Sequence, residues 1–505
     1  MSNRFLSIFD LSGIQRFIFA TNKMKEIVGA SAVVHNALFR QLPQALGEAP
    51  DAWKQGDVTF TDADEAKIVY VGGGNAMVVF RDENTYRACA RELSRKIFLL
   101  SGGAIRLTSA AVALEEAEGL AANQKRLMAA LDAEKKAGGS AVHAALLPIT
   151  AYDNNNYEPL ILTSDGRATT LSRKAKRAAA NTEQVFAEIK PSPDMSFSYD
   201  LEDTRREDEK NYQAILHIDG NTMGIRIREY VRGLTGTVWE QLTAMRRLSI
   251  AISGLYSDAL RETIRETVPS DAEGRLAFRP IVVDGDDITV MLPADRAFGF
   301  TETFMQKLAA CRIDAFGGGF RPTAAAGIAF VKLKFPFSIA YDLAESCCKN
   351  AKAVTIERCG GAAAFLANPV SSMDYQVCYS NISSDLAVYR ASSYERDGCR
   401  LTRRPYVFAE GDAYSYRAFM DTCEYFNGEM KRGNIARSKL KGLRGAYGVS
   451  RLQAEMYGSF ILAHEKGGGE TEPARRLGEP FGEAGEALFF DYLDIMDVAW
   501  KESAQ

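Results

Sequence analysis

The stretch RPIVVDGDDITVMLP, residues 279–293, decides the fold of this chain. Two runs rich in isoleucine and valine flank an Asp-Gly-Asp-Asp turn. Short β-branched runs bounded by turn residues predict a tight β-hairpin, and the Asp-Gly pair supplies the positive φ angles. The carboxylates of Asp284, Asp286 and Asp287 therefore crowd one turn, and their repulsion costs stability unless a cation lies among them. The hairpin indicates a metal site, with a simple solvated acidic turn as the alternative.

The elements around this hairpin predict a ferredoxin-like unit. NYQAILHIDGN (residues 211–221) reads as a strand that ends near Asp219. The predicted elements after it are a helix over 237–265, the hairpin, a helix over 296–311, a strand over 323–332 and a helix over 338–354. In such a unit the first strand and the hairpin are neighbours, so Asp219 can meet Asp286 and Asp287. Carboxylates on adjacent strands that hold Mg²⁺ are what in-line nucleotidyl transfer requires.

Residues 1–150 repeat the same order without the acids. A strand at 4–13 and a helical pattern precede a second hairpin at 67–80, whose tip is Gly72, Gly73, Gly74 and Asn75. The predicted elements that follow are a helix over 83–100, a strand over 104–114, a helix over 115–136 and a strand over 142–150. A glycine-rich tip lets a ligand or another backbone approach closely, although a flexible turn is the alternative.

Three segments of the second region resemble a known family. They are HIDGNTMG (217–224), VVDGDDITVMLP (282–293) and AAAGIAFVKLKFPFSIAYDLAESCCKNAK (324–352). The sequence resembles the palm-type polymerase/cyclase large subunit of type III CRISPR effector complexes, a relative of GGDEF diguanylate cyclases and class III nucleotide cyclases. DLSGIQRFIFAT (10–21), EIVGAS (26–31) and VGGGNAMVVF (71–80) resemble the non-catalytic first palm of that family.

The resemblance implies a set of site residues and cofactors. Asp219, Asp286 and Asp287 are the expected catalytic residues and metal ligands. The expected nucleotide-binding residues are Gly220, Asn221, Gly285, Lys352, Gly72, Gly73, Gly74 and Asn75. The expected cofactor is Mg²⁺ or Mn²⁺, and the expected substrate is ATP or another NTP.

The sequence departs from the family pattern at the site and in its extent. The usual GGDD is DGDD, with Asp284 in place of the first glycine, and the usual DxDN after the first strand is DGNT, with Asn221 in place of the second acid. Asp284 either restores the lost charge or obstructs the nucleotide where the backbone normally approaches. The chain shows neither a His-Asp doublet nor a cysteine-rich insert. We therefore expect a shortened relative that lacks the family's nuclease domain and zinc insert.

Two basic stretches could contact nucleic acid or a partner. Residues 167–177 contain five cations ahead of a Pro191–Pro193 break, and residues 431–451 contain seven cations with Tyr447 among them and Tyr457 nearby. The stretch at 167–177 is more typical of a solvated helix face. The stretch at 431–451 fits a solvated face and a contact for RNA or a protein equally well.

The amino-acid composition limits the kinds of protein that this chain can be. The 505 residues, 46% of them hydrophobic, form several globular domains, and a net charge of −4 argues against general coating of nucleic acid. The eight cysteines include no CxxC pair, which favours reduced thiols. With no signal-peptide pattern and no apolar run of about 20 residues, we expect a cytoplasmic protein without a membrane partner.

These observations together predict an α/β (α+β) protein with two tandem ferredoxin-like palms. The expected divisions are 1–150 (first palm), 151–210 (connector), 211–368 (second, catalytic palm) and 369–505 (a mostly helical C-terminal domain). The expected function is Mg²⁺-dependent synthesis of cyclic or linear oligonucleotides, oligoadenylate by the resemblance, as a second messenger in antiviral defence. The alternatives are a scaffold or sensor that binds nucleotide or RNA without turnover, and a GGDEF-like dinucleotide cyclase. Guide or target RNA and other CRISPR subunits are candidate partners of the C-terminal stretch, and a standalone or homo-oligomeric state is equally open.

Overall fold

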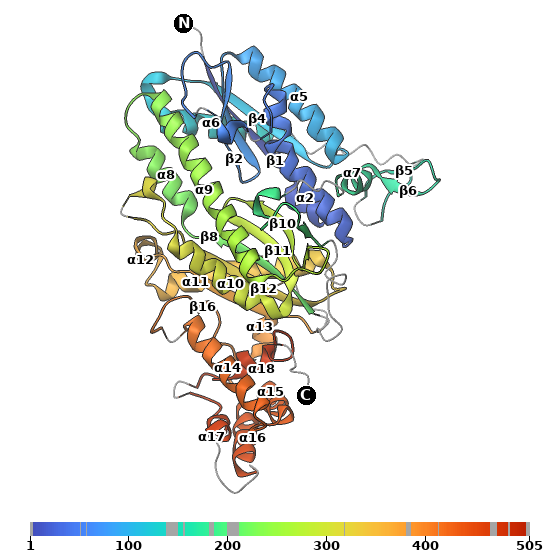
Figure 1. The fold of residues 1–505 in the computed structure, drawn as a ribbon, viewed down its shortest axis with the longest axis vertical. Helices are drawn as coiled ribbons and strands as arrows, with labels where there is room; N and C mark the ends of the chain where they lie inside the picture. Colours follow the sequence, from blue (N-terminus) through green and yellow to red (C-terminus); the bar gives the residue numbers. More distant parts are fainter. Residues whose placement is uncertain are drawn as a thin grey trace.

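The computed structural model consists of two sheet-containing parts and a helical part along its long axis (Figure 1). It describes residues 4–500 except 51, 57, 138–149, 155–156, 181–185, 199–211, 318, 380–384, 413, 465–471 and 483–484. The strand predicted over 142–150 lies almost entirely outside the described residues. Within the described part of the chain, none of the helices combines the length and apolar character needed to cross a bilayer.

The first sheet has the predicted ferredoxin-like topology. Its strand order is β2-β3-β1-β4, and all neighbouring strands are antiparallel. The strands are β1 (Phe5–Ser12), β2 (Ala66–Gly72), β3 (Asn75–Phe80) and β4 (Arg106–Ala113). The helices of this part are α1 (Ile14–Phe19), α2 (Met24–Phe39), α3 (Gln41–Ala45), α4 (Ala52–Gln55), α5 (Glu83–Ser101) and α6 (Gly119–Ala137). The helical pattern after β1 is thus divided into α1 and α2.

The second sheet repeats this topology and then grows at one edge. Its order is β10-β11-β8-β12-β13-β16, of which the first four strands are the predicted unit. The elements of that unit are β8 (Tyr212–Gly220), α8 (Met223–Gly233), α9 (Val238–Thr267), β10 (Arg279–Asp284), β11 (Asp287–Pro293), α10 (Ala297–Ala310), β12 (Ala324–Lys332) and α11 (Phe337–Arg358). β13 (Ser372–Val377) adds parallel to β12, and β16 (Tyr406–Val407) adds antiparallel to β13. The sheet therefore takes strands from beyond residue 368, while the division into domains stays a prediction.

The two faces of the second sheet pack against different parts of the molecule. Leu216 and Ile218 of β8 are buried in the core that contains residues of α9 and α10. Ile215 faces the opposite way and belongs to the core that contains β1, β2, β3 and α2 of the first part and α11, because successive side chains of a strand point to opposite faces. The first part contributes to both cores, since Leu6, Ile8 and Met77 belong to the core of α9 and α10, and the two hairpin tips lie side by side.

The C-terminal part is helical, as predicted from residue 414 onward. Its elements are α12 (Ala362–Ala367), α13 (Leu386–Tyr394), β14 (Glu395–Arg396), β15 (Cys399–Arg400), α14 (Tyr416–Lys431), α15 (Arg437–Val449), α16 (Arg451–Ala463), α17 (Glu472–Gly478) and α18 (Phe490–Ile495). Short strands β5 (Leu160–Leu162), β6 (Ala168–Thr170), β7 (Ser196–Phe197) and β9 (Arg275–Leu276) occur elsewhere.

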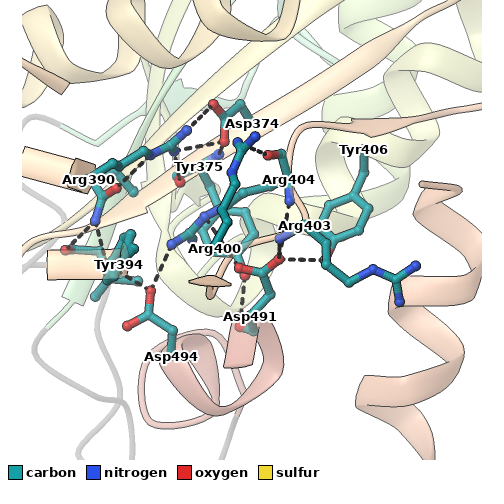
Figure 2. Close-up of polar contacts among 12 residues, drawn as sticks. Asp374, Tyr375, Arg390, Tyr394, Arg400, Arg403, Arg404, Tyr406, Asp491 and Asp494 are labelled. Carbon is teal, nitrogen blue, oxygen red and sulfur yellow. Dashed lines mark hydrogen bonds and ion pairs between the residues drawn. The ribbon is translucent and has the colours of Figure 1, made fainter. Parts of the chain in front are cut away.

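A buried ionic network joins β13 to α18 (Figure 2). Arg404, which has no exposed surface, lies 3.1 Å from Asp494 Oδ2 and 3.4 Å from Asp491 Oδ1. On β13 the fully buried Asp374 pairs with Arg390 at 2.8 Å. Buried charges of this kind are costly unless every one is paired, so the network fixes how the C-terminal helices dock on the sheet.

Helix α7 (Leu171–Ala179) carries the first basic stretch and packs on α2. Arg177 and Arg173 lie 2.8 Å and 3.6 Å from the carboxylate of the buried Glu26. A Cβ atom on Gly29 would lie 1.7 Å from Lys176 O, so only glycine permits this close helix contact. Two of the cations, Arg173 and Arg177, are thus paired with a carboxylate within the fold, so this helix is not simply a solvated face.

Replacing Lys176 with methionine is expected to stabilise the protein at neutral pH. Lys176 is 2% exposed, and burial lowers its pKa to about 8. Because the unfolded chain holds this proton up to about pH 10.4, burial of the charge destabilises the folded state below pH 8, and this penalty fades as pH rises from 8 to 10.4. The gain should be on the order of 2 kcal/mol at pH 7 and should vanish near pH 10.

Urea unfolding across this pH range measures the difference. Lys174→Met on the exposed side of the same helix is the matched control and should change stability by less than about 0.5 kcal/mol. A gain for Lys176→Met that does not depend on pH would contradict the charge-burial account.

Candidate functional site

Strand register places three carboxylates on one face at the end of the second sheet. Asp219 at the end of β8 is the cross-strand partner of Asp287 on β11, and Asp287 is in turn the partner of Asp284 on β10. Gly285 between them has a φ of 62°, the positive value predicted for this turn. Cross-strand partners point to the same face, so Asp219, Asp284 and Asp287 all face α11 and the first sheet.

Asp286 projects from the tip of the hairpin toward α9. Its carbonyl oxygen accepts a hydrogen bond from Gly220 N–H at 3.1 Å. A Cβ atom on Gly220 would lie 2.6 Å from Asp286 Oδ2 and 2.9 Å from the Tyr256 hydroxyl. Gly220 is therefore required because the carboxylate of Asp286 folds across the end of β8.

Lys352 on α11 reaches the first of these carboxylates. Its Nζ donates hydrogen bonds to Asp219 Oδ2 and, at 2.9 Å, to Gly220 O. Among the described residues no three histidine, cysteine or acidic side chains are gathered as a metal-binding group. The assignment of Asp219, Asp286 and Asp287 as ligands and of Lys352 as a phosphate contact thus stays a prediction.

The electrostatics of the hairpin favour an added cation. Burial and, after it, the neighbouring Asp219 carboxylate raise the pKa of Asp286 to about 6. Burial, together with the carboxylates of Asp284, Asp219 and Asp286, raises the pKa of Asp287 to about 7. The site therefore holds more negative charge than its surroundings compensate, and carboxylate oxygens are the ligands that Mg²⁺ prefers. A metal ion at these carboxylates stays a prediction.

Unsatisfied polar atoms lie at the end of β8. Asn221 donates from Nδ2 to Thr323 Oγ1 and to Val370 O, both at 3.1 Å, so its amide serves the fold. Asn221 Oδ1 and the hydroxyls of Thr222 and Tyr256 are buried and have no hydrogen-bond partner within the described ranges. Such atoms need an explanation in a folded protein, and a polar ligand at this edge would provide one.

Two cavities meet at Asp287. One, of about 200 Å³, lies under α11 and is lined by Asp219, Lys352 and other polar side chains. The other, of about 220 Å³, lies between the two hairpins and α2, and Gly72, Gly73, Gly74 and Asp284 line it. The glycine tip of the first hairpin therefore lies beside the acidic hairpin of the second palm.

The tip of the first hairpin has the geometry predicted for it. Gly73 and Gly74 have φ values of 63° and 71°, and Gly72 pairs with Asn75 across the turn. The side chain of Asn75 donates to Gly73 O at 3.1 Å, which closes the turn. Gly74 N–H donates to Asp284 Oδ2 at 2.9 Å. The two tips are thus bonded directly to each other.

Several site residues were not predicted from the sequence. His217 lies two residues before Asp219, faces the same way, and makes a 3.0 Å contact with Thr289 Oγ1; burial lowers its pKa, which favours a neutral ring. Because side chains two residues apart on a strand point the same way, the predicted strand could have placed His217 beside Asp219. Asp10 of β1 is the cross-strand partner of Asn75, the same place in the first sheet that Asp219 has in the second. Its carboxylate forms an ion pair with Lys135 of α6, with 2.8 Å between Oδ2 and Nζ.

The second basic stretch is largely paired inside the C-terminal part. Arg437 and Lys441 pair with Asp497, and Arg444 lies 3.6 Å from Asp494. Tyr447 is fully buried. Arg432 pairs with Glu429 and Arg451 with Glu455. These contacts reduce the charge available for RNA, so the RNA contact stays a prediction.

Comparison with known proteins finds a family model for the part of the chain that forms the first four strands of the second sheet and their helices. Residues 212–358 match the family model described as Cas10/Cmr2, second palm domain. These residues are similar to the second palm domain of Cas10/Cmr2. The predicted resemblance to the palm-type large subunit of type III CRISPR complexes is thereby confirmed, and the site described above is the end of this palm at which the hairpin turns. A search of curated proteins finds no match.

Solved structures agree with the palm assignment at the level of fold. A Csm1-Csm4 cassette in complex with pppApA has a TM-score of 0.51 and 14% identity, and the match covers 99% of this chain and 69% of that chain. The cassette in complex with pppApApA has a TM-score of 0.50 and 13% identity, with the same coverage. The cassette in complex with AMPPNP has a TM-score of 0.43 and 13% identity. This match covers 70% of this chain and 53% of the solved chain, about half of its length. Identities this low show the fold, with both sheets, and not the chemistry.

Proposed function

We propose that this chain is a divalent-metal-dependent nucleotidyltransferase that joins NTPs into short linear or cyclic oligonucleotides, oligoadenylates among them, as a signal in type III CRISPR-type defence. The observation that carries the proposal is the pairing of Asp219 with Asp287 beside Asp286 at the end of a Cas10/Cmr2-type palm. The pppApA and pppApApA bound to structures of similar fold support the adenosine product.

Asp219, Asp286 and Asp287 would hold Mg²⁺ or Mn²⁺. The cation would neutralise the triphosphate and activate the attacking hydroxyl. Lys352 donates hydrogen bonds to Asp219 and to Gly220 O at the end of β8. Its ammonium group would therefore lie within reach of a phosphate that enters there. Gly285 leaves room for that approach, because a Cβ atom there would meet nothing within 4 Å, whereas the corresponding space at Gly220 is filled by the Asp286 carboxylate. The tip at Gly72 to Asn75 would hold the second nucleotide, the one whose hydroxyl attacks.

Product analysis tests the proposal. The protein is incubated with each NTP and Mg²⁺ or Mn²⁺, and the products are identified by mass spectrometry. Oligonucleotides that require the metal are expected. Their absence with all four NTPs, in mixtures and in the presence of target RNA, would reject turnover by this chain.

A scaffold or sensor that binds nucleotide without turnover is the second candidate. It is favoured by the contact of Lys352 with Asp219, which uses one predicted ligand inside the fold. Binding of an NTP without product would support it. Contacts with further CRISPR subunits, such as the Csm4 present in the structures of similar fold, belong to either candidate.

A further inference from the structure

Asp284 bonds the two hairpin tips to each other. Its Oδ2 accepts the hydrogen bond from Gly74 N–H at 2.9 Å, across 210 residues of sequence. The glycine expected at this position from the family resemblance could not make this bond, because it has no side chain. Asp284 is also the cross-strand partner of Asp287. The residue therefore links the first palm to the carboxylate at which nucleotide chemistry is proposed.

The second oxygen of this carboxylate has no partner. Asp284 Oδ1 is buried and accepts no hydrogen bond within the described ranges of the chain. A Cβ atom on Gly72 would lie 3.5 Å from it, which is ordinary contact, so the oxygen lies beside the wall of the first hairpin. A buried carboxylate oxygen without a donor is unfavourable. The oxygen is thus ready to accept a donor from a ligand.

The adjoining cavity suits a nucleoside and not a triphosphate. Its lining, as far as the structure describes it, is mostly aliphatic and aromatic, includes Asp284 and Asp287, and contains no lysine or arginine. Phosphates would meet carboxylates here without a compensating cation. The volume of about 220 Å³ is below the roughly 300 Å³ at which sites for whole drug-sized ligands begin. The cavity would therefore take the base and sugar while the phosphates stay outside.

The position of Asp284 beside Asp287 indicates that the sugar of a bound nucleotide would donate the hydrogen bond to it. A nucleotide whose 3′-hydroxyl attacks at the metal must bring its ribose next to Asp287, and Asp284 lies directly opposite Asp287 in the hairpin. The base then extends into the apolar part of the cavity. The donor nearest to Asp284 Oδ1 is the neighbouring 2′-hydroxyl, and hydroxyl bonds to a carboxylate are among the stronger hydrogen bonds.

We propose that Asp284 is the residue that recognises the ribose of the attacking nucleotide, by accepting a hydrogen bond from its 2′-hydroxyl while holding the first palm through Gly74. This inference rests on the proposed function for the identity of the ligand. It makes Asp284 a specificity-determining residue, and it explains why an acid at this turn position is compatible with nucleotide binding instead of obstructing it.

Nucleoside binding tests the inference separately from turnover. Adenosine, 2′-deoxyadenosine and 3′-deoxyadenosine, and the corresponding guanosine set, are titrated by calorimetry into the full chain without added metal. The unmodified protein should bind a ribonucleoside at least about tenfold more tightly than its 2′-deoxy counterpart, as expected for one hydrogen bond to a charged group. The 3′-deoxy compound should bind nearly as well as the ribonucleoside.

Two variants complete the test. Asp284→Ala should bring the ratio of affinities for adenosine and 2′-deoxyadenosine close to one, whereas Asp258→Asn on the exposed side of α9 should leave it unchanged. Equal weakening of both nucleosides by Asp284→Ala would show that Asp284 only joins the palms and would overturn the inference. Absence of nucleoside binding to the unmodified protein would overturn it as well. A preserved 2′-hydroxyl preference in a protein that makes no product would instead refute the proposed function and leave the inference standing.

Discussion

Replacing Asp287 with asparagine is expected to lower nucleotide joining at least about a hundredfold and to leave the protein as stable as before or more stable. The carboxylate is proposed to hold the metal, and an amide oxygen is a weaker ligand without charge. In the absence of metal, burial and the repulsion by Asp284, Asp219 and Asp286 together raise the pKa of the same carboxylate to about 7. Asparagine removes that repulsion. Activity and stability should therefore move in opposite directions.

Product yield by mass spectrometry and thermal unfolding without metal measure the two effects. Asp258→Asn is a suitable control because its side chain is 63% exposed and pairs with Arg261 of the same helix; both readouts should stay unchanged. Full activity of Asp287→Asn would remove Asp287 from the metal site. Loss of activity together with a large loss of stability would mean that the substitution damages the fold and not the site.

Replacing Arg404 with methionine is expected to destabilise the protein by about 3–5 kcal/mol, the usual result of leaving buried charges unpaired. Asp491 and Asp494 would lose their buried cation, and the Tyr375 ring would lose the guanidinium that lies 4.1 Å from its centre. Adding Asp491→Asn and Asp494→Asn should recover part of the loss, because coupled sites are not additive. Chemical unfolding followed by circular dichroism gives the free energies.

Arg417→Met provides the matched control for the buried arginine. Arg417 is 64% exposed and pairs with Asp421 at 2.8 Å on the surface of α14. Exposed pairs contribute little, so its loss should change stability by less than about 0.5 kcal/mol. Similar losses for Arg404→Met and Arg417→Met would show that the network does not hold the C-terminal helices to the palm.

The order of elements and the acidic hairpin were predictable because both are local. Alternating apolar residues, an Asp-Gly turn and a strand that ends at Asp219 determine the sheet and the pairing of Asp219 with Asp287. β13 was missed because its sequence, SMDYQV, is buried on both faces and includes Asp374 and Gln376. A polar strand inside a sheet has no alternation to detect, and its partners Arg390 and Arg404 come from distant loops and helices.

Charges were predicted least well because their partners are remote in sequence. Lys176 and Arg177 look like a solvated face until α2 supplies Glu26, about 150 residues earlier. The cations at 431–451 look available for RNA until Asp494 and Asp497 fold back beside them. Asp284 was expected either to compensate for Asn221 or to obstruct the nucleotide. The structure shows it bonded to Gly74 of the other hairpin, a contact that neither expectation included, and both expectations stay predictions.

The parallel pairing of β12 with β13 has a consequence for the order in which the protein forms. β12 ends at Lys332, whereas β13 begins at Ser372 and is closed by β16 at Tyr406. During synthesis the second palm therefore emerges with β12 as an open edge, and this edge is apolar along eight of its nine residues. Open edges of this kind pair with other chains. Ribosome-associated chains that stop between residues 332 and 372 should accordingly depend on chaperones, and that dependence should end once residue 407 has been released.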